Sequence, residues 1–376
     1  QEGEKMKKFL VLLLTVCLSF CLFGCTSTEK ESGNEEQTTS VDLGDIQIGF
    51  VPSKDAQVIL DAAANLPAVL KEKLEAKGYT VGEITMTVGT DFAVVGEGME
   101  SGSIEIGFLN TVTYASFAGE NVQLCVEALR NGVADANGKI FENNCDFDLY
   151  NQGITTDAAE LVTGYPGLIY VNVGTEKGAD LYAKAVAGTL TWEDVNTAAW
   201  QSSGVSSSSG YIYPSLWVNN LFGEGAGNEV RTLSNLDNLT INSSGYASMM
   251  SNLLAQQCDV IVGYSDVRKD QASTDDFNTL KGEGYYAEFE NVWDVIKVIG
   301  ASAYIMNDTV SLSANENAFN GNYSEQLLAD IQEIFLEFSG SEEYMAMFAP
   351  YSHKGYAIGT DADYDPAREA AKIFAE

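Results

Sequence analysis

The feature that most constrains the fold is a regular alternation of strand-like and helix-like patterns that begins near residue 46. Ile46–Pro52 is a short apolar run that stops at a proline, which is typical of a strand entering a loop. Ala56–Lys77 then places leucines at helical spacing, and Gly78 closes that pattern. A strand at Thr80–Val88 and a helix at Phe92–Met99 repeat the order. The sequence therefore predicts an α/β fold.

The alternation continues through the rest of the chain. Further predicted elements are a strand at Ile104–Phe108, a helix from about Thr111, strands near Gly167–Val173, Asp259–Val262 and Val295–Tyr304, and helices at Glu325–Phe338 and Glu342–Phe348. A chain that leaves a first block and later returns to it would place a cleft between two lobes. The pattern alone leaves that topology open.

The first residues have the order of a secretory signal. The basic residues Lys7 and Lys8 precede an apolar run from Phe9 to Phe23, which leads into Gly24 and Cys25. We expect residues 1–24 to be a signal peptide and Cys25 to be lipidated, because the spacing resembles the bacterial lipobox. The alternative is a retained membrane helix, but the run is too short for the roughly 20 residues that a span requires.

The segment that follows the predicted lipidation site is polar. Residues 25–44 should form a flexible tether, because Thr26–Val41 contains almost no apolar side chains. We therefore expect a protein that is anchored in the cell membrane through lipid and faces outside the cytoplasm.

Charge excludes two classes of partner. The formal net charge of −34, from 54 acidic and 20 basic residues, argues against a basic patch for nucleic acid or for an anionic membrane surface. It does not exclude a small anionic ligand.

The remaining cysteines and the single histidine limit the possible chemistry. No Cys-x-x-Cys motif occurs, and His353 is the only histidine, so we expect no metal, no cofactor and no histidine-based catalytic set. Cys125 and Cys145 could form a disulfide or remain two independent thiols. Cys258 lies in an apolar run and is predicted to be a core residue.

A serine cluster precedes the helix that contains Pro214. Because proline costs little only in the first turn of a helix, this helix should begin near Gly210, directly after Ser206–Ser209. Free backbone amides, the positive end of the helix dipole and several hydroxyls then converge, which suits a tetrahedral oxyanion without any arginine. A serine-rich linker with an ordinary helix cap is the alternative.

Similar polar passages precede other predicted helices. They are Asn242–Ser248, Thr90–Phe92 and Asn110–Thr111. In open α/β sheets, ligands bind beyond the carboxyl ends of strands, where these loops should gather.

These passages also carry a family resemblance. The matching stretches are Gly49–Ser53, Thr90–Ala93, Gly102–Leu109, Ser207–Tyr211 and Asp361–Ala370. Over roughly residues 46 to 372, the chain resembles the substrate-binding lipoproteins of phosphate/phosphite/phosphonate ABC transporters.

The resemblance implies a bilobal type II periplasmic-binding-protein fold with the ligand cleft between two lobes. We assign residues 45–165 and 300–376 to lobe 1, and residues 166–299 to lobe 2. The implied function is capture of a phosphorus oxyanion by a monomer that delivers it to an ABC permease in the membrane. Alternatives are the same fold binding a sulfonate or another small nutrient, and a surface hydrolase, which would lack a credible nucleophile and base.

The resemblance also implies site residues in the serine cluster and the first lobe. The hydroxyls and amides of Ser207, Ser208, Ser209 and Gly210 would hold the phosphonate oxygens. Thr90 matches a first-lobe contact, and Phe92 stands where the family has a tyrosine, so that hydroxyl contact is missing.

Further implied site residues lie around the second lobe. Tyr246 stands at a family histidine, and Tyr165 at a family tyrosine. Of two acidic positions that hold the ammonium of aminoethylphosphonate in some members, one is Asp266 and the other is Ser302. The missing carboxylate argues against that ligand. Without the resemblance, Phe92 and Tyr165 would be expected in the core and Asp266 as a solvated acid or helix cap.

Overall fold

The structure is a computed structural model that describes residues 40–141, 145–242 and 244–373. The predicted signal peptide, the lipidation site at Cys25 and the tether up to residue 39 lie outside the described residues. From Ser40 onward the chain forms one compact unit. Within the described residues, no helix has the length and apolar character that a membrane crossing requires.

The larger of the two main sheets has seven strands in the order β14-β6-β13-β5-β2-β4, with β7 paired to β6. Its strands are β2 (Ile46–Phe50), β4 (Ile84–Val88), β5 (Ile106–Leu109), β6 (Val122–Ala134), β7 (Thr156–Val162), β13 (Thr309–Ser313) and β14 (Gly355–Ala357). Strand β2 runs parallel to β4 and β5, whereas β13 runs antiparallel to β5 and β6.

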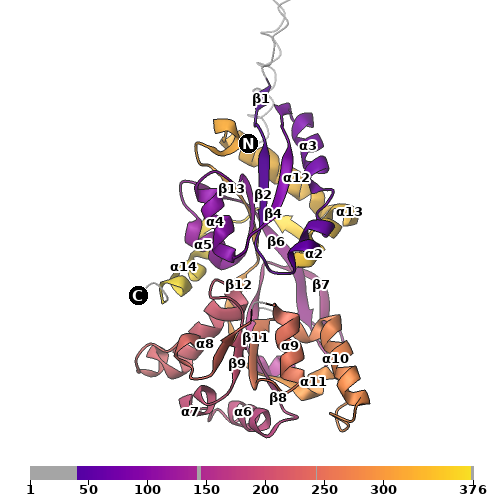
Figure 1. The fold of residues 1–376 in the computed structure, drawn as a ribbon, viewed down its shortest axis with the longest axis vertical. Coiled ribbons are helices and arrows are strands. Elements are labelled where there is room, and N and C mark those ends of the chain that lie inside the picture. The colour runs from indigo at the N-terminus through magenta and orange to yellow at the C-terminus, as the bar shows by residue number, and fades with distance from the viewer. Residues whose placement is uncertain (1–39, 142–144, 243, 374–376) are drawn as a thin grey trace, which may run out of the picture. The chain divides into compact units, whose positions relative to one another are not determined.

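Helices lie on both sides of the larger sheet (Figure 1). They are α2 (Ala56–Ala62), α3 (Leu66–Ala76), α4 (Phe92–Glu100), α5 (Thr111–Phe117), α12 (Glu325–Ser339), α13 (Glu342–Met345) and α14 (Asp365–Lys372). The core between them is rich in stacked rings: Phe108 packs against Phe50 and Phe348, with ring centroids 4.6 and 5.4 Å away.

The smaller sheet has five strands in the order β10-β9-β11-β8-β12. Its strands are β8 (Gly164–Asn172), β9 (Trp200–Ser202), β10 (Leu239–Ile241), β11 (Val260–Tyr264) and β12 (Ile296–Met306). The helices around it are α6 (Glu176–Val186), α7 (Trp192–Asn196), α8 (Tyr213–Phe222), α9 (Tyr246–Leu254), α10 (Gln271–Gly282) and α11 (Val292–Val295) (Figure 1).

Strand β8 shows why this second sheet is covered on both faces. Ile169 and Val171 pack into one hydrophobic cluster, whereas Leu168 and Tyr170 pack into another. All four side chains are buried, and successive residues of a strand point to opposite faces. A continuous apolar run of this kind is expected for a strand that is buried on both sides. The bilobal α/β fold predicted from the sequence is thus built around two separate sheets.

Two predicted boundaries differ from the structure. The predicted helix Ala56–Lys77 is two helices, α2 and α3, because the chain turns at Asn65 and Pro67 then occupies the first turn of α3. The predicted tether, residues 25–44, also extends too far along the chain. Val41–Asp42 forms strand β1, which pairs with β3 (Tyr79–Thr80), and Leu43 is fully buried beside it.

The cysteines of the described residues are all free. Cys125 is buried and Cys145 is exposed, so the disulfide that the sequence left open is absent and the independent-thiol alternative holds. Cys258 is buried in the core, as predicted.

Candidate functional site

A cavity of about 560 Å³ is lined by residues of both lobes. The first lobe contributes residues that follow β2 and β5, such as Ser53 and Asn110, together with Arg130 of β6. The second contributes the serine cluster, Tyr246 and the residues that follow β11. Several of these loops follow the carboxyl ends of strands, where ligands of α/β proteins bind.

The serine cluster forms the start of a helix, slightly earlier than predicted. A single π-helical turn, Ser208–Ile212, precedes α8, and Pro214 lies in the first turn of α8. The hydroxyl of Ser207 caps this start by accepting the backbone N–H of Gly210 at 3.3 Å. Position 210 has no room for a side chain, because a Cβ there would lie 2.7 Å from Ser207 Oγ and 2.9 Å from the Tyr246 hydroxyl.

Three hydroxyls meet at one wall of the cavity. The Tyr246 hydroxyl is hydrogen-bonded to Ser207 Oγ at 2.9 Å and to Ser209 Oγ at 3.1 Å. Burial raises the pKa of Tyr246, so its phenol is neutral at physiological pH. We call these three side chains the hydroxyl cluster. Each hydroxyl can donate or accept, because its hydrogen rotates to suit its partner.

Ser208 faces the first lobe. Its Oγ accepts hydrogen bonds from Asn110 Nδ2 at 3.1 Å and from the backbone N–H of Val112 at 3.3 Å. Asn110 also caps α5 by accepting the backbone N–H of Thr113. The hydroxyl of Ser208 therefore links the serine cluster to the start of α5.

Arg130 and Asp308 form an ion pair in the cavity wall. Arg130 Nη2 donates to Asp308 Oδ2 at 2.6 Å, and the guanidinium lies over the ring of Tyr165 at 5.2 Å. Burial alone would raise the pKa of the Asp308 carboxyl, but Arg130 and His353 lower it below its ordinary value. His353 lies behind the pair, with Nε2 3.4 Å from Asp308 Oδ2, and burial lowers its pKa. The cavity as a whole thus contains an arginine, which the sequence reasoning about the serine cluster did not identify.

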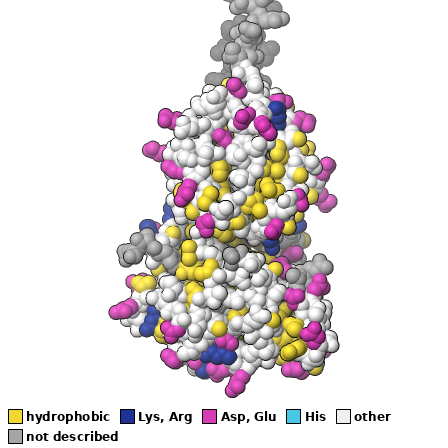
Figure 2. Space-filling view, in the orientation of Figure 1, with side chains coloured by type: hydrophobic (Ala, Val, Ile, Leu, Met, Phe, Trp, Pro, Cys, Tyr) yellow, Lys and Arg dark blue, Asp and Glu magenta, His cyan; other side chains and the backbone are white. Residues whose placement is uncertain are grey.

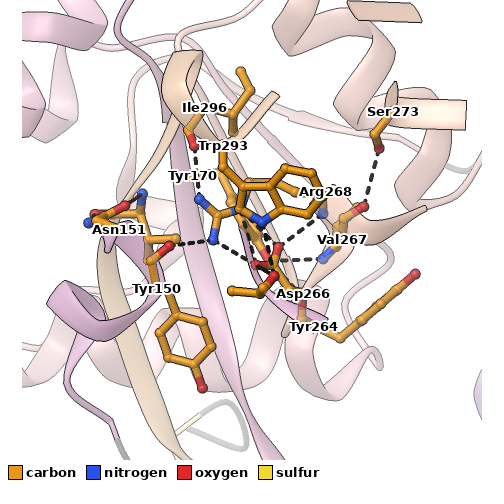
Figure 3. Close-up of polar contacts among 12 residues, drawn as sticks. Tyr150, Asn151, Tyr170, Tyr264, Asp266, Val267, Arg268, Ser273, Trp293 and Ile296 are labelled. Carbon is orange, nitrogen blue, oxygen red and sulfur yellow. Dashed lines mark hydrogen bonds and ion pairs between the residues drawn. The ribbon is translucent and has the colours of Figure 1, made fainter. Parts of the chain in front are cut away.

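Asp266 lines the cavity, but its carboxylate is engaged inside the protein (Figure 3). Its side chain and that of Arg268 are both 0% exposed and form an ion pair at 2.6 Å. Thr155 donates a further hydrogen bond to Asp266 at 2.8 Å, and Arg268 also donates to the carbonyls of Tyr150 and Ile296. Burial would raise the pKa of Asp266, but Arg268 lowers it below its ordinary value. Asp266 is not a solvated loop acid; it caps the short 3-10 turn Val267–Lys269 by accepting the backbone N–H of Arg268 at 3.0 Å, in line with the helix-cap alternative.

The structure places some of the other predicted site residues in the cavity lining and others outside it. Phe92 and Tyr165 line the cavity, together with the three serines and Tyr246. Thr90 is exposed just before α4 and is not among the lining residues. Ser302 is also outside the lining, and its buried Oγ accepts from Gly167 N and donates to Ala303 O. Gly210 lies directly behind the hydroxyl cluster.

Three lysines also line the cavity. Lys269 pairs with Asp157, whereas Lys54 lies 5.9 Å from the ring centre of Tyr264 and Lys354 has no carboxylate within ion-pair distance among the described residues. These cations contrast with the outer surface, where acidic side chains predominate on the face in Figure 2. Among the described residues, no group of His, Cys, Asp and Glu could hold a metal ion.

Comparison with known proteins gives one family match. The family described as "ABC transporter, phosphonate, periplasmic substrate-binding protein" matches residues 48–364. No curated protein is similar enough in sequence to match the chain.

Solved structures share the fold at low sequence identity. A binding protein component of an ABC phosphonate transporter from Pseudomonas aeruginosa is 14% identical, with a TM-score of 0.53, over 87% of this chain and 85% of that chain. PhnD1 from Prochlorococcus marinus, solved with methylphosphonate, is 11% identical with a TM-score of 0.53, over 89% and 99%. A Xanthomonas citri protein bound to ATP is 9% identical with a TM-score of 0.56, over 88% and 97%.

Proposed function

Because the chain belongs to the family of periplasmic substrate-binding proteins of ABC phosphonate transporters, we propose that its cavity binds the phosphonyl group of the ligand through the hydroxyl cluster. The family is a transport component and not an enzyme, and its members work with a membrane permease. The ligand of this chain is then a phosphonate or a closely related phosphorus oxyanion, such as phosphite or phosphate.

The observation that carries this proposal is the meeting of Ser207, Ser209 and Tyr246 beside a helix start. Neutral hydroxyls and backbone N–H groups bind an oxyanion without requiring a counter-charge at every oxygen. Such a site suits a protein of strongly negative net charge, because short-range donors act locally while the overall field acts at long range.

The membrane arrangement of the protein is a second part of the proposal. We infer from Gly24 and Cys25 that the mature chain carries lipid at its first residue and acts outside the cytoplasm, and we propose that it acts as a monomer. Metabolic labelling with a fatty acid should label the protein, and Cys25→Ala should remove the label. A labelled Cys25→Ala protein would contradict lipidation at this residue.

A panel of ligands tests the ligand class. The fold alone does not determine the ligand, since the structurally similar Xanthomonas citri protein binds ATP. Isothermal titration should detect binding of methylphosphonate, phosphite or phosphate, and none of taurine. Heat with taurine alone would instead support the alternative of a sulfonate-binding protein.

Alanine substitutions test the role of the hydroxyl cluster. Replacing Ser207 and Ser209 together should weaken methylphosphonate binding at least about tenfold, because hydrogen bonds to charged groups contribute about 1.5–3 kcal/mol each. Ser206→Ala is the matched control, since Ser206 belongs to the same cluster but does not line the cavity. If the double variant and the control bind methylphosphonate with equal affinity, Ser207 and Ser209 do not contact the ligand and have only a structural role.

A further inference from the structure

Arg130 has no part in the function proposed above, although it stands in the cavity wall. Its side chain is 19% exposed, and one edge of the guanidinium is held by Asp308 at 2.6 Å. The Nε atom is buried and has no hydrogen-bond partner among the described residues. Because Nε is closed off, the exposed part of the side chain that the cavity can reach lies elsewhere on Arg130, which lines the cavity.

Arg130 lies close to the hydroxyl cluster. Tyr165 connects the two, because its ring lies under the guanidinium at 5.2 Å and its hydroxyl interacts with Ser209. Arg130 and Asp308 also act electrostatically on the Tyr246 phenol. The guanidinium and the three hydroxyls therefore share one region of the cavity.

We propose that Arg130 binds an anionic oxygen of the ligand through the exposed guanidinium N–H groups that Asp308 leaves free, beside the hydroxyl cluster, and this inference rests on the proposed function. A guanidinium carries five N–H donors in a rigid plane, so the ion pair with Asp308 leaves further donors for a ligand. A charge-assisted bond from one of these N–H groups to a phosphonyl oxygen would add fixed positive charge to a site otherwise built from neutral groups.

The same geometry selects the organic part of the ligand. The two buried carboxylates that line the cavity, Asp266 and Asp308, are each paired with an arginine of the protein. Neither is free to hold the ammonium group of a ligand. Three further carboxylates line the cavity: Asp157 pairs with Lys269, Asp270 accepts from the Tyr264 hydroxyl, and Glu160 is exposed to solvent. With both of its buried carboxylates occupied, the site favours phosphonates with an uncharged substituent, such as methylphosphonate, over aminoethylphosphonate.

Asp308 gives the proposal a distinctive consequence. Its negative charge lies next to the guanidinium and repels a bound anion. Asp308→Asn keeps an oxygen that can accept from Arg130 but removes that charge, so affinity for methylphosphonate should rise. Because removing a negative charge beside the cavity favours any bound anion, the contact made by Arg130 itself is tested by adding Arg130→Gln to this change.

Titration calorimetry with methylphosphonate and aminoethylphosphonate tests the proposal on the whole protein. Arg130→Gln combined with Asp308→Asn removes both charges together, which avoids a buried unpaired carboxylate. It should bind methylphosphonate at least about tenfold more weakly than Asp308→Asn alone, the loss expected for one charge-assisted hydrogen bond. Arg231→Gln is the control, because it makes the same charge change at an arginine that stacks on Trp192 outside the cavity.

The outcomes separate this inference from the proposed function. A double variant that binds methylphosphonate as tightly as Asp308→Asn alone, or an Asp308→Asn variant with unchanged affinity, would overturn the role of Arg130. Tighter binding of aminoethylphosphonate than of methylphosphonate by wild type would overturn the substituent preference. If wild type bound no phosphorus oxyanion, the proposed function itself would fail. Circular dichroism and thermal unfolding of each variant establish that the comparison concerns folded protein.

Discussion

The buried pair of Asp266 and Arg268 yields a prediction for stability. Arg268→Met keeps a long apolar stem of similar reach, but it removes the guanidinium that contacts Asp266 and the carbonyls of Tyr150 and Ile296. The Asp266 carboxylate, which is 0% exposed, would remain buried without its counter-charge. Breaking a buried pair from one side costs about 3–5 kcal/mol, so the free energy of unfolding should fall by that amount.

Urea unfolding, followed by both circular dichroism and tryptophan fluorescence, measures this loss. Arg231→Met is the matched control, because Arg231 has no carboxylate within ion-pair distance in the described part of the chain. Adding Asp266→Asn to Arg268→Met removes the unpaired charge and should recover part of the lost free energy. A loss below about 1 kcal/mol, the value of an exposed ion pair, would refute the reasoning.

Three further predictions concern other parts of the molecule. Gly210→Ala should weaken methylphosphonate binding in calorimetry, because its Cβ would press on Ser207 and Tyr246, whereas Gly204→Ala, with nothing within 4 Å of its Cβ, should bind normally. Burial lowers the pKa of His353, so the unfolded chain binds the proton more readily, and the urea midpoint should fall as the pH drops below about 6.5. His353→Gln should reduce that dependence on pH. An unchanged pH profile would show that protonation of His353 is not its cause. In the folded protein without the predicted signal and lipidation segment, Ellman's reagent should label Cys145 quickly and the two buried cysteines only after unfolding.

Much of the fold was predictable because its elements have a clear period. The short apolar runs at β2, β5, β8 and β11 are strands as expected, and their alternation with helices identified the α/β class. Strand β6 was missed, since its long run mixes apolar and polar residues without a clean period. The break between α2 and α3 was also missed, although Pro67 marked it.

The site was predictable only where its signal was local. Pro214 identified the helix start, and the serine cluster lies directly before it. Arg130, Asp308 and His353 come from distant parts of the chain, and each is unremarkable in its own segment, so only the tertiary structure brings them together. The pairing of Asp266 with Arg268 was hidden for another reason. The two side chains meet in the short 3-10 turn that follows β11, where Asp266 also accepts the backbone N–H of Arg268, and nothing in the local sequence marks that turn.

The hydroxyl cluster has a consequence for the protonation state of what it binds. Phosphonates exchange their second proton near neutral pH, so mono- and dianions coexist in the surroundings of a cell. A hydroxyl can donate its hydrogen to an unprotonated phosphonyl oxygen or accept a hydrogen bond from a P–OH group. Because the hydroxyls of Ser207 and Ser209 are both hydrogen-bonded to that of Tyr246, the three hydroxyl hydrogens can reorient together. The same wall can thus accommodate either ionic form without moving a heavy atom, which would keep capture effective as the acidity outside the cell changes.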